Sequence, residues 1–326
     1  MKYTYIAGTG SYVPDEIISN FALEKMIDTS DEWIRTRTGI VERRIAGKDE
    51  ATSDLAVKAA QLALEDAGLE ANDLDLIITA TVTPDMLFPS TGCMVQKKIE
   101  AQKAAAFDIS AACSGFLYAL EVGDQLIKSG QYHNILVLGA DTLSKITDWT
   151  DRNTCVLFGD GAGAVILRAR EENQGVLCSH LFSDGAMSEM LQVPAGGSLR
   201  PASEETVQNR LHYISMKGNE IFKTAIKAMT EAIEQAAASG GIPIDTIDFF
   251  IFHQANTRII NAVAQRLSIP ENKIPLTIQK YGNTSTASMP ITLDELNKAG
   301  KIHRGDIICF AAFGGGLTWA SSLVKW

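Results

Sequence analysis

A cysteine set among small residues is the first candidate for chemistry. Cys113 stands in the run Ala-Ala-Cys-Ser-Gly at residues 111–115, where a predicted strand gives way to a predicted helix. A helix start carries exposed backbone N–H groups and partial positive charge, so we expect a lowered pKa and a nucleophilic sulfur. The alternative is a buried structural cysteine, which is how we interpret the other four. Those are Cys93, Cys155, Cys178 and Cys309.

A histidine at the end of an apolar strand is the second candidate. His253 follows the run Phe-Phe-Ile-Phe at residues 249–252 and precedes Gln-Ala-Asn, which opens a predicted helix. Because α/β folds bind ligands at the carboxyl ends of their strands, we favour a functional role over the structural role that a lone histidine more often has. The other four histidines lie in polar or loop-like stretches and keep the structural interpretation: His133, His180, His212 and His303.

Two glycine-rich runs also need an interpretation. Phe-Gly-Gly-Gly at residues 313–316 ends a predicted strand, and its backbone could approach a ligand closely and offer N–H groups to a developing oxyanion. No Gly-Lys-Ser/Thr follows it, which excludes a P-loop. The run at residues 158–164 leads into a predicted strand rather than a helix. This excludes a dinucleotide-binding turn and indicates tight packing against the site.

Composition narrows the class of protein. The 326 residues are 46% hydrophobic and 21% charged, which is typical of a globular chain long enough for two domains or one duplicated unit. A net charge of −10 argues against a sequence-independent grip on nucleic acid. The start of the sequence shows no signal-peptide pattern, and charged residues and glycines interrupt every apolar run. We therefore expect a cytoplasmic protein with no nucleic-acid or membrane partner.

Cysteine usage agrees with that expectation. Five cysteines are an odd number, they are widely spaced, and no C-x-x-C occurs. This pattern disfavours a zinc site or a disulfide framework and indicates reduced thiols. We expect no metal.

Helical and strand patterns alternate along the chain. Residues 53–67 and 115–129 predict helices, while the short apolar runs at 74–80, 103–111 and 134–139 predict buried strands. Such alternation predicts an α/β fold whose sheets are covered on both faces.

The second half of the sequence repeats this order at an offset of about 170 residues. A constant offset across several elements indicates two duplicated halves, residues 1–173 and 174–326, joined near the charged stretch at 170–175. The duplication places Asn283 opposite Cys113, each at a helix start, so that both would point at one central site. The matching runs are 63–67 with 232–236, 74–78 with 247–251, 126–130 with 296–300, and 135–138 with 307–310.

Taken together, four motifs resemble those of the thiolase-fold condensing enzymes, most closely the β-ketoacyl-[acyl carrier protein] synthase III family. The resemblance extends from residues 8–12 and 29–34 to the final strand. A Cys-His-Asn set separates this branch from the elongating synthases, which carry Cys-His-His, and Asn283 decides between them. The motifs are Ala-Cys-Ser-Gly-Phe at 112–116, His-Gln-Ala-Asn at 253–256, Gly-Asn-Thr-Ser at 282–285 and Phe-Gly-Gly-Gly at 313–316.

The resemblance implies a duplicated five-layer αβαβα fold with mixed sheets, a homodimer and no cofactor, since acyl-CoA is a substrate. Cys113 would take an acyl group from acyl-CoA and then join it, with loss of carbon dioxide, to malonyl-[acyl carrier protein]. This condensation initiates fatty-acid synthesis. Backbone N–H groups of Cys113 and Gly315 would form the oxyanion hole, while His253 and Asn283 would stabilise the malonyl enolate.

Binding residues follow from the same resemblance. Trp33 and Arg152 would sandwich the CoA adenine, although Trp33 could instead be a packing residue of a surface helix. Phe88, flanked by prolines on a loop, would close the acyl pocket of the partner subunit. Further CoA contacts would come from Thr29, Arg37, Gly218, Asn219, Ala255 and Asn256.

An acidic carrier protein needs a basic surface. Lys223 and Arg258 are expected to form a local basic surface at the mouth of the tunnel for the pantetheine arm of CoA, despite the acidic net charge of the chain. Nearby Lys227 and Arg266 also fit ordinary solvated helix faces.

The sequence leaves three rival functions open. One is a related condensing enzyme, either a polyketide-type starter synthase or a hydroxymethylglutaryl-CoA synthase, although we find no acidic general base for the latter. Another is a cysteine thioesterase that uses Cys113 and His253 with water. The third is a non-catalytic acyl-CoA-binding protein, against which the Cys-His-Asn set argues.

Overall fold

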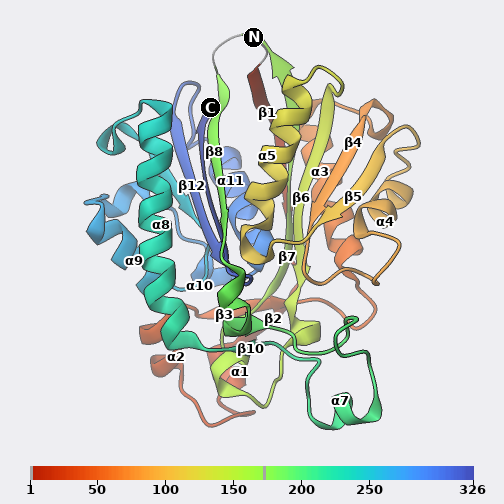
Figure 1. Cartoon of the computed structure of the whole chain (residues 1–326), viewed down its shortest axis with the longest axis vertical. Helices are drawn as coiled ribbons and strands as arrows, with labels where there is room; N and C mark the ends of the chain where they lie inside the picture. Colours follow the sequence, from red (N-terminus) through yellow and green to blue (C-terminus); the bar gives the residue numbers. More distant parts are fainter. Residues whose placement is uncertain (1–2, 172–173) are drawn as a thin grey trace.

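Residues 3–171 and 174–326 are described by the computed structural model, and they form two mixed sheets with helices on both faces of each (Figure 1). In the first sheet β4 runs parallel to β5 and β6, whereas β7 is antiparallel to both β6 and β1. Its strands, in order across the sheet, are β1 (Tyr3–Tyr12), β7 (Asp160–Arg170), β6 (Asn134–Thr142), β4 (Leu76–Ala80) and β5 (Ala105–Ile109).

The second sheet repeats this pattern. Strand β11 is parallel to β12, and β13 is antiparallel to both β12 and β8. Thus β11, β12, β13 and β8 take the places of β4, β6, β7 and β1. The division that we predict after residue 173 adjoins residues 172–173, which lie outside the described ranges, and it stays a prediction. The strands are β11 (Phe249–Phe252), β12 (Ile307–Gly314), β13 (Thr318–Lys325) and β8 (Gly175–Ser183).

Helices complete five layers, which confirms the αβαβα prediction. Helices α3 and α4 cover the outer face of the first sheet, and α8 and α9 cover the outer face of the second. Between the sheets lie α5 and α11, the helices that follow Cys113 and Asn283 (Figure 1). Their bounds are α3 (Thr52–Ala67), α4 (Thr91–Lys98), α5 (Gly115–Lys128), α8 (Gly218–Gly240), α9 (Thr257–Arg266) and α11 (Ser288–Lys298).

The cores explain why the strands read as continuous apolar runs. In β4, Leu76 and Ile78 pack into the middle layer against α5, whereas Ile77 packs outward with α3. All five residues of this strand are buried. Burying each such side chain stabilises the fold by roughly 1.5–3 kcal/mol, so both faces of the strand must be apolar.

Smaller elements surround the lower part of the molecule in Figure 1. A two-stranded ribbon pairs β2 with β3, and β9 pairs with β10. A projecting segment carries α7. These elements are β2 (Glu16–Ser19), β3 (Glu42–Ile45), β9 (Leu191–Gln192), β10 (Ser215–Met216), α1 (Asn20–Leu23), α2 (Asp31–Thr38), α6 (Arg152–Cys155), α7 (Glu204–Gln208) and α10 (Ile278–Tyr281).

The short 3-10 helices are η1 (Ala71–Asp73), η2 (Ala112–Ser114), η3 (Leu143–Ile146), η4 (Gly185–Met190), η5 (Ile244–Thr246), η6 (Glu271–Lys273) and η7 (Ser285–Ala287). Within the described ranges, no helix combines the length and hydropathy that crossing a membrane requires.

Candidate active site

Cys113 lies in the tight turn between the first sheet and the middle helical layer. It belongs to η2, directly ahead of α5, and its side chain is buried. Thr318 on β13 donates its hydroxyl to the Ala111 carbonyl at 2.8 Å, so the second sheet also holds the turn. A Cβ on Gly314 would stand 2.6 Å from the Cys113 nitrogen. Only a glycine therefore lets β12 approach the Cys113 backbone so closely.

His253 extends β11 by one residue, because its N–H donates to the Ala311 carbonyl at 2.9 Å. The ring is buried, and its Nδ1 lies 2.7 Å from the Ser288 hydroxyl. Burial lowers the pKa of His253 to about 3, since an imidazolium would lose its hydration there. The imidazole is therefore neutral at physiological pH.

Asn283 is fixed through both its backbone and its side chain. Its N–H donates to the Leu157 carbonyl at 2.8 Å, and its own carbonyl accepts from Gly159 N–H at 3.0 Å. The side-chain oxygen accepts the Ser285 N–H at 2.9 Å, so the amide NH2 is the end left to donate elsewhere. A Cβ on Gly159 would stand 2.2 Å from the Tyr281 carbonyl oxygen. This confirms that the glycine-rich run at 158–164 packs tightly against the site.

Cys113 stands where two cavities meet. One, of about 260 Å³, is lined by Cys113, His253 and Asn283 together. The other, of about 310 Å³, is lined by Cys113, Gly315 and several aliphatic side chains. Cys113, Phe158 and Leu191 belong to both linings. The fold thus brings the three predicted catalytic side chains, which are far apart in sequence, to one cavity.

The pKa of Cys113 departs from the sequence-based expectation. Burial raises it to about 12, and the charge of Asp141 acts in the same direction. The nearby Ser285 hydroxyl acts the opposite way, but its oxygen has no partner of normal hydrogen-bond geometry in the described part of the chain. The expected lowered pKa is therefore wrong for the resting site. Removing a thiolate from water outweighs the favourable field of the helix start.

The proposed CoA residues occupy the first cavity only in part. Its lining includes Trp33, Arg37, Gly218, Ala255 and Asn256. The remaining three predicted contacts, Thr29, Arg152 and Asn219, are not part of that lining.

Trp33 and Arg152 do lie together, but they touch each other. The Arg152 guanidinium carbon is 4.2 Å from the Trp33 ring centroid, and that of Arg37 is 5.1 Å away. Two stacking contacts in series need a separation of about 7 Å, twice the usual contact distance. An adenine would have to displace Arg152 from the indole face before it could lie between them.

The predicted docking cations are exposed near the first cavity. Arg258 lines the cavity, and its guanidinium carbon lies 5.2 Å from the Phe222 ring centroid. Lys223 is exposed on α8. Lys227, one turn further on, pairs with Glu231 at 3.9 Å, which fits an ordinary solvated helix face.

Phe88 lines neither cavity of its own chain. Its side chain is 84% exposed, as is that of Leu87, on the loop between β4 and α4. Pro89 follows Phe88 directly and Pro84 lies four residues before it, and the fixed φ of each proline restricts the loop.

Comparison with known proteins places these features in a family. The model of 3-oxoacyl-[acyl-carrier-protein] synthase III matches residues 107–185, and the model of its C-terminal part matches residues 237–326. The chain is 57% identical over 321 residues to the β-ketoacyl-[acyl-carrier-protein] synthase III of Caldanaerobacter subterraneus, covering 98% of this chain and 97% of that protein. The chain belongs to the β-ketoacyl-[acyl-carrier-protein] synthase III family.

Two further relatives agree with that assignment. The synthase III of Natranaerobius thermophilus is 52% identical over 329 residues, covering 100% of both chains. The crystal structure of 3-oxoacyl-[acyl-carrier-protein] synthase III from Aquifex aeolicus VF5 is 49% identical, with a TM-score of 0.92 over 99% of this chain and 100% of that one. Membership of the synthase III family makes the chain a condensing acyltransferase, and the polyketide and thioesterase alternatives are not favoured.

Some residues of this synthase III site escaped the sequence analysis. Ser288, beside the His253 ring, lies five positions beyond Asn283 on the helix that follows it. Asp141 is fully buried and accepts hydrogen bonds from Thr81 at 3.0 Å and Thr286 at 2.9 Å, which ties the Cys113 side of the site to the Asn283 side. In the sequence, Asp141 follows the predicted strand at 134–139, and Ser288 stands five residues after Asn283. No sequence pattern indicates which residue either of them contacts.

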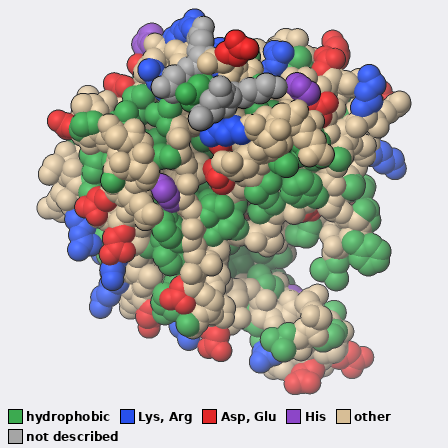
Figure 2. Space-filling view, turned by 45° about the horizontal axis from the view of Figure 1, so that its top comes forward, with side chains coloured by type: hydrophobic (Ala, Val, Ile, Leu, Met, Phe, Trp, Pro, Cys, Tyr) green, Lys and Arg blue, Asp and Glu red, His purple; other side chains and the backbone are tan. Residues whose placement is uncertain are grey.

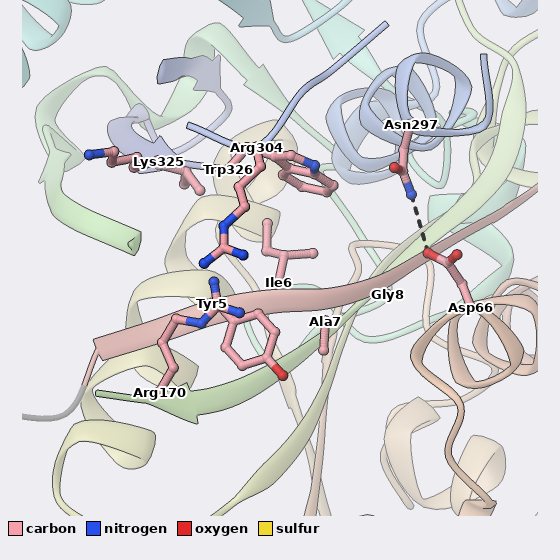
Figure 3. Close-up of a pocket in the computed structure, with 11 residues that line it drawn as sticks. Tyr5, Ile6, Ala7, Gly8, Asp66, Arg170, Asn297, Arg304, Lys325 and Trp326 are labelled. Atoms are coloured by element: carbon pink, nitrogen blue, oxygen red, sulfur yellow. Dashed lines mark hydrogen bonds between the residues drawn. The ribbon is translucent and has the colours of Figure 1, made fainter. Parts of the chain in front are cut away.

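A separate cavity of about 310 Å³ lies beside the C-terminal residue Trp326 (Figure 3) and shares no lining residue with the two cavities at Cys113. Its wall includes Arg170, Arg304 and Trp326, and contains neither cysteine nor histidine. Asn297 donates to Asp66 across one side of it at 3.2 Å. This cavity therefore lies outside the site formed by Cys113, His253 and Asn283.

Proposed function

We propose that this chain joins an acyl-CoA primer to malonyl-[acyl carrier protein], releasing CoA and carbon dioxide, by using Cys113, His253 and Asn283 as a divided site. The observation that carries the proposal is the junction of two cavities at Cys113. One cavity is lined by apolar side chains that suit an acyl chain, and the other brings His253 and Asn283 to the same sulfur.

Acyl transfer is the first half-reaction. The Cys113 sulfur attacks the thioester carbon of acyl-CoA, and the carbonyl electrons move onto oxygen. Backbone N–H groups of Cys113 and Gly315 hold this oxyanion, a role supported by the place of both residues in the second cavity. The carbon–sulfur bond to CoA then breaks, and the thiol proton of Cys113 ends on the departing CoA sulfur.

Decarboxylation and condensation form the second half-reaction. The carbon–carboxylate bond of the malonyl group breaks, carbon dioxide leaves, and the electron pair delocalises onto the thioester oxygen. His253 and Asn283 donate hydrogen bonds to that oxygen. The enolate carbon then attacks the acyl group on Cys113 and expels the thiolate, which takes a proton from water to restore the resting thiol. The pKa of His253, about 3, supports a donor over a base, because so weak a base would remove a proton poorly.

Binding of CoA would follow the first cavity from its mouth. Adenine would displace Arg152 from the Trp33 face, with Thr29 and Arg37 beside the nucleotide. The pantetheine arm would pass Gly218, Asn219, Ala255 and Asn256. Arg258 and Lys223 at this mouth would receive the acidic carrier protein through electrostatic steering.

A homodimer would complete the acyl cavity. Val82 and Ile146 line both this cavity and an open cleft of about 590 Å³, which also has Met86 and Leu87 in its wall. The acyl cavity therefore continues toward the loop that exposes Phe88. Hydrophobic side chains gather on this side of the molecule, above the projecting segment with α7 (Figure 2). A partner subunit covering that surface would place its Phe88 at the end of the cavity.

We also propose that the enzyme works in the cytoplasm.

The test is intact-protein mass spectrometry after exposure to a panel of acyl-CoAs. We expect one acyl group on the wild type and on Cys93→Ala, Cys155→Ala, Cys178→Ala and Cys309→Ala, and none on Cys113→Ala. Acyl label on the Cys113→Ala protein would overturn the assignment of the nucleophile. Free acid without carbon dioxide from malonyl-[acyl carrier protein] would instead indicate a thioesterase.

A further inference from the structure

Among the residues that the structure describes, the His253 ring has one hydrogen-bond partner, which lies at Nδ1. Its Nδ1 lies 2.7 Å from the Ser288 hydroxyl, and the Gln254 N–H donates to the same hydroxyl at 3.3 Å. Both Ser288 and His253 are buried, with 2% and 3% of their surface exposed. In the described ranges, the Ser288 hydroxyl has no third hydrogen-bond partner.

A serine hydroxyl carries one proton, so two arrangements are open. In the first, the Ser288 O–H donates to Nδ1, and Nε2 keeps the imidazole proton. In the second, Nδ1–H donates to Ser288, whose hydroxyl proton then has no acceptor. A buried donor left without a partner costs about 1–3 kcal/mol, so the first arrangement is favoured.

We infer that Ser288 is a positioning residue that fixes His253 as the Nε2–H tautomer, aimed at the thioester oxygen of the malonyl substrate. The role of the Nε2–H group toward the malonyl oxygen rests on the proposed function. The tautomer itself follows from the geometry of the resting site. Gly or Ala at position 288 would leave Nδ1 free to carry the proton, and the imidazole would then present a lone pair to a developing negative charge.

The surroundings of Ser288 are held firmly enough for this role. Its carbonyl accepts the Thr292 hydroxyl at 2.8 Å on α11. On the other side, the Gln254 side chain donates to the Phe252 carbonyl at 2.8 Å and accepts from Thr277 N–H at 3.0 Å. These contacts fix the positions of the hydroxyl, the ring and the donating N–H in the resting site.

Two readouts in Ser288→Ala and Ser288→Thr test the inference. Nitrogen-15 NMR of labelled histidine should show His253 as the Nε2–H tautomer in the wild type and in Ser288→Thr, and a mixture in Ser288→Ala. In the same proteins, carbon dioxide release should fall about 10- to 100-fold in Ser288→Ala, while acylation of Cys113 falls less than about threefold. Ser288→Thr should restore most of the release, because it keeps the hydroxyl.

Ser321→Ala is the matched control. Ser321 is also buried and hydrogen-bonded, to the Ala232 carbonyl at 2.7 Å, but it faces α8 rather than His253. It should lose stability without a selective loss of carbon dioxide release. An Nδ1–H tautomer in the wild type, an unchanged tautomer in Ser288→Ala, or equal losses in both half-reactions would overturn the inference.

These outcomes separate the inference from the proposed function. A wild type that neither releases carbon dioxide nor condenses would refute the proposed function. The NMR measurement needs no turnover and would still decide the tautomer.

Discussion

The two helix starts at the centre of the molecule differ in what they offer a substrate. The turn before α5 presents a sulfur beside a largely apolar cavity, and burial raises the pKa of that thiol. The turn before α11 presents an amide whose oxygen is already engaged, next to a neutral imidazole held by Ser288. In the proposed function, these two matching turns serve as a covalent attachment point and as a pair of hydrogen-bond donors. The difference between the turns is the basis for proposing that the two half-reactions use opposite sides of the same site.

The largest effect should come from removing a donor on the second side. His253→Ala or Asn283→Ala should lower carbon dioxide release from malonyl-[acyl carrier protein] about 100- to 1000-fold, since each removes one hydrogen bond to the developing enolate. Acylation of Cys113 should be affected much less. Radiolabelled carbon dioxide release and intact mass spectrometry measure the two separately. If His253 served mainly to deprotonate Cys113, acylation would fail first.

The pH dependence of Cys113 tests the first side. A raised pKa means that the thiol stays protonated below about pH 12, so the thiolate fraction grows with pH across the neutral range. Alkylation of Cys113 in the free enzyme should therefore rise about tenfold per pH unit from about pH 6 to about pH 9. Peptide-resolved mass spectrometry distinguishes it from Cys93 and Cys178, which are half-buried. An alkylation rate that stops rising above about pH 7 would contradict the raised pKa and support the lowered pKa that the helix start predicts.

Charge reversal at the tunnel mouth should have a smaller and more selective effect. Lys223→Glu or Arg258→Glu should reduce use of malonyl-[acyl carrier protein] about tenfold at low salt, because the acidic carrier is steered by these cations. Acylation by acyl-CoA should fall far less, and least in Lys223→Glu, because Arg258 also lines the cavity proposed for CoA. Arg266→Glu, at the far end of α9, is the matched control. Equal losses with both substrates would point to damage to the cavity instead of the docking surface.

The smallest change should follow from trimming the exposed aromatic. Phe88→Ala should shift primer preference toward longer acyl-CoAs by about fivefold, which corresponds to about 1 kcal/mol, the lower end of the worth of a methylene in an apolar pocket. Competition among acyl-CoAs, read by mass spectrometry, gives the preference, and sedimentation gives the oligomeric state. An unchanged preference in a stable dimer would remove Phe88 from the acyl cavity, and a monomer would remove the partner subunit.

Sequence patterns predicted the layers better than the details of the site. Runs such as residues 74–80 and 134–139 are apolar because both faces of each strand are covered, so their place in a sheet could be inferred. The repeated offset also predicted that Asn283 lies near Cys113, and both residues line the same cavity. The β2–β3 ribbon and the α7 segment were not anticipated, since they are short and lack periodicity.

Features that depend on tertiary burial escaped prediction. The helix start predicted a lowered pKa for Cys113. The structure shows the opposite shift because the thiol is buried, and the residues next to Cys113 in the sequence do not indicate that burial. The contact of Arg152 with Trp33 is a choice of side-chain conformation between segments far apart in the chain. The contact between Ser288 and His253 likewise could not be predicted, because it forms only where the start of α11 packs against the end of β11.

The central claim is that acyl transfer and enolate formation use different groups, and a reciprocal pair of variants tests it most directly. Acylation from acyl-CoA and carbon dioxide release from malonyl-[acyl carrier protein] are measured separately in Cys113→Ala and His253→Ala. We predict that Cys113→Ala loses acylation but still releases carbon dioxide, whereas His253→Ala is acylated but releases almost none. Loss of both half-reactions together in both variants would contradict the division.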